Sequence, residues 1–269
     1  MKHPLRYLFL FSFMNFFIAN AGAESMYKLN LVLDPNSHFL KVQGSISGLT
    51  KDFKPYLNGG FKIESLGTSE KPISYFFNLE GKSPPYVDIG KPISLNESPP
   101  ILDFVYSGKI ENTISDVNLI SSDLVELSIY SAWYPFCPNL KQFSYELTVT
   151  LPAEYNVITS GELLYRKRNG SQQTLKFSFL GNTTDIPLIA SKNFVPYRIS
   201  HGKMTIEMWT TDGDQKFMDR QIANMAEALT SYESLYGKSA LSGVMKFVYS
   251  PRNGWGYSRL PLFVVSEQR

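Results

Sequence analysis

The sequence predicts a mainly β protein, in which an antiparallel β-sandwich or saddle-shaped sheet assembly precedes a shorter mixed segment. Short apolar runs with alternating polarity fill the chain from residue 27 to about 198, without a helical period. The 16 prolines and 18 glycines are concentrated between these runs, as turn punctuation. After residue 200 the period changes to that of a helix flanked by strands. We therefore expect a β-domain over residues 24–200 and a mixed segment over residues 201–269.

Residues 1–23 are predicted to be a secretory signal peptide. A positively charged start leads into an apolar run at residues 7–18, and small residues follow, with cleavage expected after Ala21 or Ala23. The apolar run is too short to span a bilayer stably, although an uncleaved anchor remains the alternative. The chain is thus expected to be exported, to the periplasm or the extracellular space, with no stable membrane span after cleavage.

The β-domain is expected to open with a hairpin. Residues 27–33 alternate between apolar and polar side chains, residues 34–36 have turn chemistry, and the alternation resumes at residues 39–46. Further strands are expected at residues 101–106, 124–129, 143–151, 161–168, 174–180 and 189–196.

The mixed segment is expected to run strand, helix, strand, strand. A strand is predicted at residues 203–210, and Asp212 and Asp214 are placed to cap the helix that follows. Gly237 is expected to end that helix as a left-handed cap, before strands at residues 244–249 and 260–265. One apolar stripe, expected to face the core, consists of Met218, Ile222, Met225, Leu229, Tyr232 and Tyr236.

Charge argues against a nucleic-acid partner. Without Lys2 and Arg6 of the signal segment, the 26 basic residues fall to the number of acidic residues, 24, so the mature chain is formally neutral. The basic cluster at residues 166–168 immediately precedes Asn169-Gly170, a strong hairpin signal, and is most simply an exposed hairpin tip.

Few side chains indicate a chemical role by their type and sequence context alone. Cys137 is the only cysteine, which excludes an intramolecular disulfide, and we interpret it as a buried, inert thiol. The neighbouring Trp133 and Tyr134 are interpreted as packing residues between sheets.

The order of motifs resembles a known family. The stretches YKLNLVLDPNSHFLKVQGSISG, VYSGKI, WYPF, YELTVTLPAEYNVITSGELL, MTIEMWTTD and YESLYGK follow one another along the chain. In this order they resemble the amino-terminal half of the zinc aminopeptidases related to aminopeptidase N, over residues 26–267. The resemblance implies a saddle-like β-domain beside the start of an α+β, thermolysin-like catalytic domain. It also implies the family reaction, metal-assisted hydrolysis of N-terminal peptide bonds.

The family's zinc motif is not present in the sequence. That motif, H-E-x-x-H, places two histidines on one face of a helix, with a glutamate that activates the metal-bound water. Beyond the signal segment the chain has only His38 and His201, which are far apart and are interpreted as surface loop residues. We therefore expect no catalytic residue, metal ligand or cofactor in this chain, which would be inactive alone, whereas zinc is expected in a full-length relative.

The resemblance suggests four substrate-binding residues. The family's cleft strand usually carries Gly-x-Met-Glu-Asn, whose backbone pairs with the peptide and whose glutamate holds the free amine. Here the corresponding stretch contains Gly254, Gly256 and Tyr257 but no acid, so backbone pairing is expected without secure recognition of an amino terminus. Gln142 corresponds to a Gln or Glu that the family places before a β-domain strand. As an alternative, the two glycines shape a tight turn.

Two other interpretations of the whole chain remain open. One is a non-catalytic β-sandwich module that binds peptides or proteins, and the other is a truncated gene product. The expected partners are accordingly peptides or a missing catalytic portion.

Overall fold

The computed structural model describes residues 25–84, 87, 89–110, 119–140, 142–211, 214–237, 243–251 and 256–266. The predicted signal peptide, Asp212 and Gly254 lie outside the described residues. Across these described ranges, no helix combines the length and the apolar composition needed to cross a lipid bilayer.

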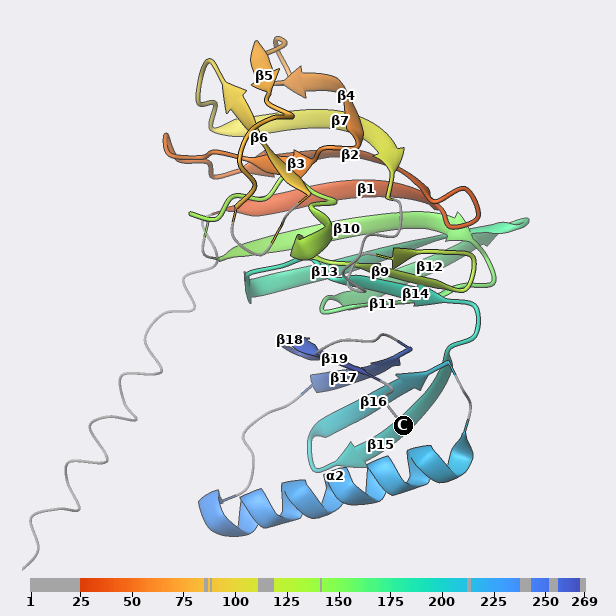
Figure 1. Cartoon of the computed structure of the whole chain (residues 1–269). Coiled ribbons are helices and arrows are strands. Elements are labelled where there is room, and N and C mark those ends of the chain that lie inside the picture. The colour runs from red at the N-terminus through yellow and green to blue at the C-terminus, as the bar shows by residue number, and fades with distance from the viewer. Residues whose placement is uncertain are drawn as a thin grey trace, which may run out of the picture.

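The largest element is a seven-stranded sheet with the order β12-β13-β10-β1-β2-β7-β4 (Figure 1). The predicted opening hairpin is confirmed as the antiparallel pair β1–β2, while β1 also pairs in parallel with β10. The strands of this sheet are β1 (Met26–Asp34), β2 (Phe39–Ser47), β4 (Phe61–Gly67), β7 (Ile101–Lys109), β10 (Phe143–Pro152), β12 (Glu162–Asn169) and β13 (Gln172–Thr183). The predicted hairpin tip at Asn169-Gly170 is confirmed by the β12–β13 pair and by the positive φ of 59° at Gly170.

Two smaller sheets complete the first part of the molecule, which runs from β1 to β14. A four-stranded sheet has the order β11-β14-β9-β8, and a three-stranded sheet has the order β3-β6-β5. Their strands are β3 (Tyr56–Asn58), β5 (Tyr75–Phe77), β6 (Gly90–Leu95), β8 (Leu119–Ile120), β9 (Leu124–Leu127), β11 (Asn156–Thr159) and β14 (Leu188–Ser191). A 3₁₀ turn, η3 (Ile129–Ser131), follows β9. Side chains from all three sheets form one continuous apolar core.

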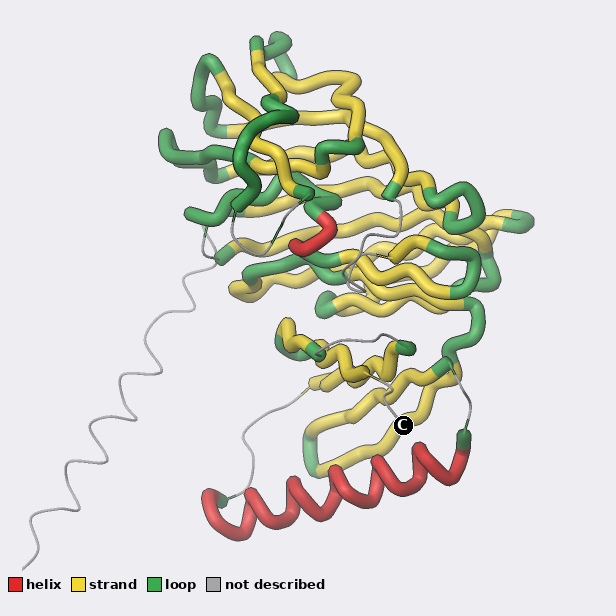
Figure 2. Tube along the Cα trace, in the orientation of Figure 1, coloured by secondary structure: helices red, strands yellow, loops and turns green. Residues whose placement is uncertain are grey.

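The second part is a five-stranded sheet with a long helix on the side away from the first part (Figures 1 and 2). Its elements are β15 (Val195–His201), β16 (Met204–Thr210), α2 (Gln215–Tyr236), β17 (Gly243–Ser250), β18 (Tyr257–Arg259) and β19 (Leu262–Ser266). The sheet order is β15-β16-β17-β19-β18, so β18 is an edge strand. The predicted order of strand, helix, strand and strand is confirmed, with β18 as an additional short strand.

Two predicted strands differ from the structure. The run expected at residues 124–129 leaves the strand conformation after Leu127 and enters η3. The run expected at residues 189–196 divides into β14 and β15, which belong to different sheets. In both places an apolar side chain continues the pattern through the change of direction: Ile129 is half-buried in η3, and Phe194 is buried between β14 and β15, next to the exposed Lys192 and Asn193.

The apolar packing of the helix extends to Leu229, and Glu233 near its C-terminal end contacts His201 of β15. Met218 is fully buried, and Ile222, Met225 and Leu229 contact the sheet. Tyr232 and Tyr236, which were predicted to face the core, are 64% and 80% exposed, so that prediction was wrong. A helix of 22 residues is about 33 Å long, whereas a strand of seven residues spans about 23 Å, so the helix outruns the strands beneath it.

The helix ends also test the capping predictions. Asp214 is the N-cap and accepts a hydrogen bond from the Phe217 backbone N–H at 3.1 Å, as predicted. Gly237 follows the helix with φ 88° and ψ 168°. Its positive φ requires glycine, but this ψ lies outside the left-handed helical region, so the predicted left-handed cap was wrong.

The two parts are joined by a small apolar cluster and by polar contacts. Lys246 on β17 donates from Nζ to the backbone oxygens of Thr159 at 2.9 Å and Gly161 at 2.6 Å. The Ser250 hydroxyl donates to Glu126 at 2.9 Å. The buried members of the cluster are Leu124, Ile158, Ile189, Phe194, Val248, Leu262 and Val264. These contacts fix where β18 and β19 lie relative to the first part.

Candidate functional site

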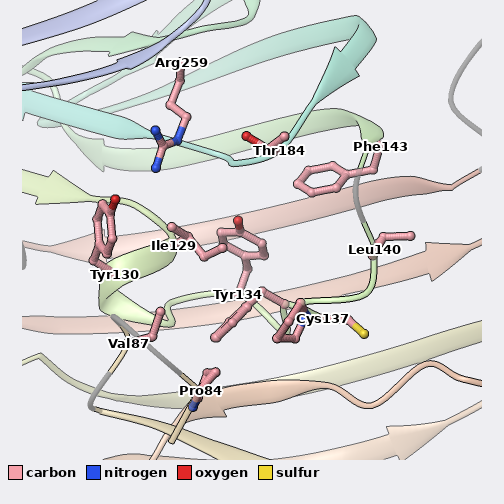
Figure 3. Close-up of a pocket in the computed structure, with 12 residues that line it drawn as sticks. Pro84, Val87, Ile129, Tyr130, Tyr134, Cys137, Leu140, Phe143, Thr184 and Arg259 are labelled. Carbon is pink, nitrogen blue, oxygen red and sulfur yellow. The ribbon is translucent and has the colours of Figure 1, made fainter.

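A cavity of about 500 Å³ lies between η3, the loop that follows it, and β18 (Figure 3). Most of its wall is aromatic or aliphatic, and one arginine enters from the second part. Its lining includes the side chains of Ile129, Tyr130, Tyr134, Phe136, Phe143 and Arg259. A cavity of this volume, mostly apolar with a few polar groups, is typical of a small-molecule or peptide side-chain site.

The 3₁₀ turn η3 presents the aromatic side chains of the wall. The Ser128 side chain caps the turn by accepting from the Tyr130 backbone N–H at 3.3 Å, and Ser131 bonds back to Ser128. Ala132 then takes a left-handed conformation, with φ 46° and ψ 36°, and reverses the chain. The reversal brings Tyr130 and Tyr134 to the same cavity, as Figure 3 shows.

The following residues are anchored in the core, as the packing prediction for Trp133 and Tyr134 required. Both side chains are fully buried, and the Trp133 indole donates to the Ile186 backbone oxygen at 3.1 Å. Two core tyrosines, Tyr27 and Tyr106, donate to the backbone oxygens of Pro135 and Trp133. Tyr134 therefore belongs to the packing and also to the cavity wall.

Asp185 organises the polar end of the site. Its carboxylate has no exposed surface, and Oδ1 accepts from the backbone N–H groups of Ile129 at 2.8 Å and Ile186 at 2.7 Å. The Tyr134 hydroxyl donates to the same oxygen at 3.0 Å, and Arg259 Nε donates to Oδ2 at 2.9 Å. Burial raises the pKa of Asp185 above its ordinary value, while the charge and hydrogen bond of Arg259 and the other donors oppose that shift.

Arg259 reaches this carboxylate from edge strand β18. The centre of its guanidinium lies 5.7 Å from the ring centre of Tyr130 and 5.4 Å from that of Tyr257, and Nη1 donates to the Ser258 backbone oxygen at 2.9 Å. Burial is the largest single effect and lowers the pKa of Arg259, but the charge of Asp185 and the interactions with Tyr130 together outweigh it, so the net shift is upward. The guanidinium is thus held as a cation, with 18% of the side chain exposed.

The structure places the four predicted substrate-binding residues unequally around this site. Tyr257 packs against Tyr130, with ring centres 6.5 Å apart, and against Arg259. Gln142 is exposed and directly precedes Phe143, whose ring lines the cavity. A Cβ added at Gly256 would overlap the Val264 backbone oxygen, so the close approach to the backbone of β19 requires glycine at this position. Gly254 lies outside the described residues, and the binding roles of all four stay predictions.

The residues that give the site its charge were missed in the sequence. Arg259 follows Tyr257 by only two positions, so the stretch that was singled out for Tyr257 also contained this basic residue. Asp185 lies in the Thr-Thr-Asp-Ile stretch after β13 and belongs to no motif. Its importance comes from a contact that spans 74 positions of the chain, which no local pattern reports.

The described residues do not fit a zinc site. Nowhere in the described ranges do three or more His, Cys, Asp or Glu side chains gather closely enough to hold a metal ion. His38 lies in the β1–β2 turn with φ 58°, in agreement with its loop assignment. His201 is the last residue of β15 rather than a loop residue, and its Nε2 lies 3.1 Å from Glu233 on α2. Cys137 is buried, as predicted.

A larger hollow of about 980 Å³ lies between β12, β13 and the sheet of the second part. Three of the five charged side chains that line it are engaged with protein groups: Arg198 pairs with Glu207 at 2.7 Å, and Lys246 bonds to backbone oxygens. We regard the cavity at Arg259 as the candidate site because it borders β18, the strand that contains the predicted residue Tyr257.

Comparison with known proteins supports the predicted resemblance at the level of the fold. No protein-family model and no curated protein matches the sequence. The structure matches an M1 zinc metallopeptidase from Deinococcus radiodurans with a TM-score of 0.60 and 12% identity, over 91% of this chain and 60% of that chain. A mutant of that enzyme bound to a Tyr-Ser-Ala substrate matches equally well. A two-domain M1 zinc metallopeptidase mutant bound to L-arginine matches with a TM-score of 0.61 and 12% identity, over 91% of this chain and 61% of that chain.

The matches confirm the mainly β fold class and the structural relation to M1 zinc metallopeptidases. At 12% identity they show a shared fold alone. The chain spans about 60% of the length of these solved structures.

Proposed function

We propose that this chain is the substrate-recognition part of an exported protein of the zinc-aminopeptidase type, and that it binds peptides at the cavity beside β18. In the complete enzymes of that type a metal centre hydrolyses the N-terminal peptide bond. The chain itself is predicted to bind without turnover, because its sequence contains no H-E-x-x-H motif and its described residues gather no metal-binding group.

One observation carries the proposal: an edge strand borders an aromatic cavity that contains a fixed charge. β18 ends the five-stranded sheet, so its outer backbone groups are placed to pair with an added strand. Arg259 on this strand lines the cavity together with Tyr130 from the first part, and Tyr257 packs against both residues. Backbone pairing supplies affinity in this mode of recognition, and the adjacent pocket selects a side chain or terminus.

The solved structures add support of a different kind. One matching M1 metallopeptidase was crystallised with a Tyr-Ser-Ala substrate. That enzyme therefore accommodates a short peptide, and this chain matches 60% of its length at 12% identity, which transfers no individual contact.

The first experiment measures binding and turnover on the same sample of purified mature chain. Calorimetric titration with a panel of tripeptides should show binding, amino-acyl fluorogenic substrates should show no turnover, and metal analysis should find no stoichiometric zinc. Turnover that is lost on adding a chelator would contradict the predicted inactivity. Absence of binding by every peptide would contradict the recognition role.

A matched pair of variants locates the binding. Tyr130→Ala removes an aromatic wall of the cavity and should weaken peptide binding about tenfold, since a buried aromatic contact contributes about 1.5 kcal/mol. Tyr165→Ala removes a tyrosine that is 47% exposed on β12, outside the cavity, and should leave the affinity unchanged. Equal losses in both variants would place the binding elsewhere.

A further inference from the structure

We infer that the cavity selects peptides that present a carboxylate, which Arg259 binds, rather than peptides that present a free amine. This inference rests on the proposed function. It specifies which ligand group enters the cavity, and it reverses the charge preference of an aminopeptidase cleft that holds a free amine with an acid.

The acid of the site has no capacity left for a ligand. Asp185 is fully buried and already accepts hydrogen bonds from two backbone N–H groups, from Tyr134 and from Arg259. Three of these donors are bonded to Oδ1 and Arg259 to Oδ2, and the carboxylate has no exposed surface, so an incoming ammonium would have to displace Arg259 to reach it. Asp185 therefore anchors Arg259 and does not contact the ligand.

The cation is the charge that the cavity presents. A guanidinium carries five N–H groups, and Asp185, Ser258 and the Tyr130 hydroxyl engage only part of them. Figure 3 shows the guanidinium between Tyr130 and Thr184, at the end of the cavity opposite Pro84. The rings of Tyr130 and Tyr257, whose centres are 6.5 Å apart, both lie beside the guanidinium and restrict how its plane can turn. A planar fork held in this way matches the two oxygens of a carboxylate.

The apolar remainder of the wall favours a carboxylate over an ammonium group as the ligand of Arg259. Ile129, Phe136 and Phe143 line the cavity, and no acidic side chain other than the engaged Asp185 borders Arg259 among the described contacts. An ammonium placed here would lose its water shell next to a fixed positive charge, whereas a carboxylate would be paired. The carboxylate has two sources in a peptide: an acidic side chain or the free carboxyl terminus.

Four tripeptides, measured by calorimetry with the intact mature chain, separate these possibilities. A peptide with Glu and an amidated terminus is compared with its Gln isostere, and a neutral peptide with a free carboxyl terminus is compared with its amide. At least one carboxylate-bearing peptide should bind about tenfold or more tightly than its neutral counterpart, as charge-assisted hydrogen bonds require. The pair that shows the difference identifies the source. N-acetylation of the same peptides should change the affinity less than twofold.

Variants then connect the preference to Arg259. Arg259→Lys keeps the charge but loses the planar fork, and should reduce the preference for carboxylate several-fold. Because Arg259→Gln alone leaves the Asp185 charge buried and unpaired, the charge is removed in the double variant Asp185→Asn/Arg259→Gln, which should abolish the preference. Arg198→Gln removes a guanidinium that is 66% exposed on β15 and serves as the matched control, with the preference retained. Thermal unfolding of each variant verifies that it is folded.

The outcomes separate this inference from the proposed function. If peptides bind but the carboxylate-bearing and neutral members of both pairs bind equally, the inference is wrong and the peptide-binding role stands. Loss of binding on N-acetylation would show amine recognition and would also overturn it. If no peptide binds, the proposed function fails and the inference fails with it. If both Arg259 variants keep the full preference, another group binds the carboxylate and the assignment to Arg259 is wrong.

Discussion

The two parts of the molecule bury their side chains to very different degrees. In the first part three sheets share one core, and all of the largest fully buried side chains, such as Trp133, Tyr106 and Tyr145, belong to it. In the second part the cluster between sheet and helix has five buried members, and α2 contributes only Met218 to it. The first part thus resembles a complete domain core, whereas the second has one well-packed end and one exposed end.

This difference explains how the candidate site is built. Asp185, Tyr130 and Tyr134 are fixed by the extensive core of the first part. Arg259 and Tyr257 come from β18, the edge strand of the less extensively buried part. The ion pair between Asp185 and Arg259 therefore holds the two parts in register at the cavity, in addition to any contact that Arg259 makes with a ligand.

The largest expected effect is a loss of stability caused by a substitution in the core of the first part. Trp133 is fully buried, and its indole N–H is bonded to Ile186, so Trp133→Ala should lower the free energy of unfolding by about 3–5 kcal/mol, through a cavity and a lost hydrogen bond. Urea denaturation followed by circular dichroism measures the loss. Trp133→Phe, which retains most of the volume, should cost clearly less. A loss below about 1 kcal/mol for the alanine variant would mean that the core repacks around the gap.

The difference in burial also explains which elements could be predicted from the sequence. Alternation within residues 27–33 and 39–46 predicted β1 and β2 because each strand has one face on the core. Strands β3, β5 and β6 were missed because they are short and lie where proline and glycine interrupt any period. In the helix, the apolar stripe correctly predicted an amphipathic face, but its spacing contains no information on the length of the sheet beneath Tyr232 and Tyr236.

The site was predicted less completely than the fold. Tyr257 was identified through a family resemblance, whereas Asp185 and Arg259 become a unit only when the second part docks onto the first. The same is true of Lys246, whose partners Thr159 and Gly161 lie far away in the sequence. Pairings of this kind depend on tertiary structure and leave no periodic signal.

At the junction of the two parts, the stability contributed by Lys246 is expected to depend on pH. Burial lowers the pKa of Lys246 to about 8, against the opposing charges of Glu207 and Glu162. Between pH 8 and the ordinary lysine pKa the unfolded chain binds more protons than the native chain at this group, so stability from Lys246 rises with pH in that window. The gain relative to a variant without the amine should reach about 3 kcal/mol at most.

Urea unfolding at pH 7.5 and pH 10 of the native chain and of Lys246→Met measures this effect. Because the tyrosines titrate in both proteins, their contribution cancels in the difference between the two. The native chain should gain about 2 kcal/mol or more relative to the variant between the two pH values. Curves that remain parallel would mean that the amine is solvated and that the junction is more open than its contacts with Thr159 and Gly161 indicate.

The smallest expected effect lies at the exposed end of α2. Tyr236 is 80% exposed and stacks on Tyr232, which is 64% exposed, with ring centres 6.2 Å apart. Tyr236→Ser should therefore change the free energy of unfolding by no more than about 0.5 kcal/mol, as is usual for exposed positions. The measurement is urea denaturation at neutral pH beside the unsubstituted chain. A loss above about 1 kcal/mol would show that this end of the helix is covered in solution, and the contrast between the extensive core of the first part and the exposed end of the helix would no longer hold.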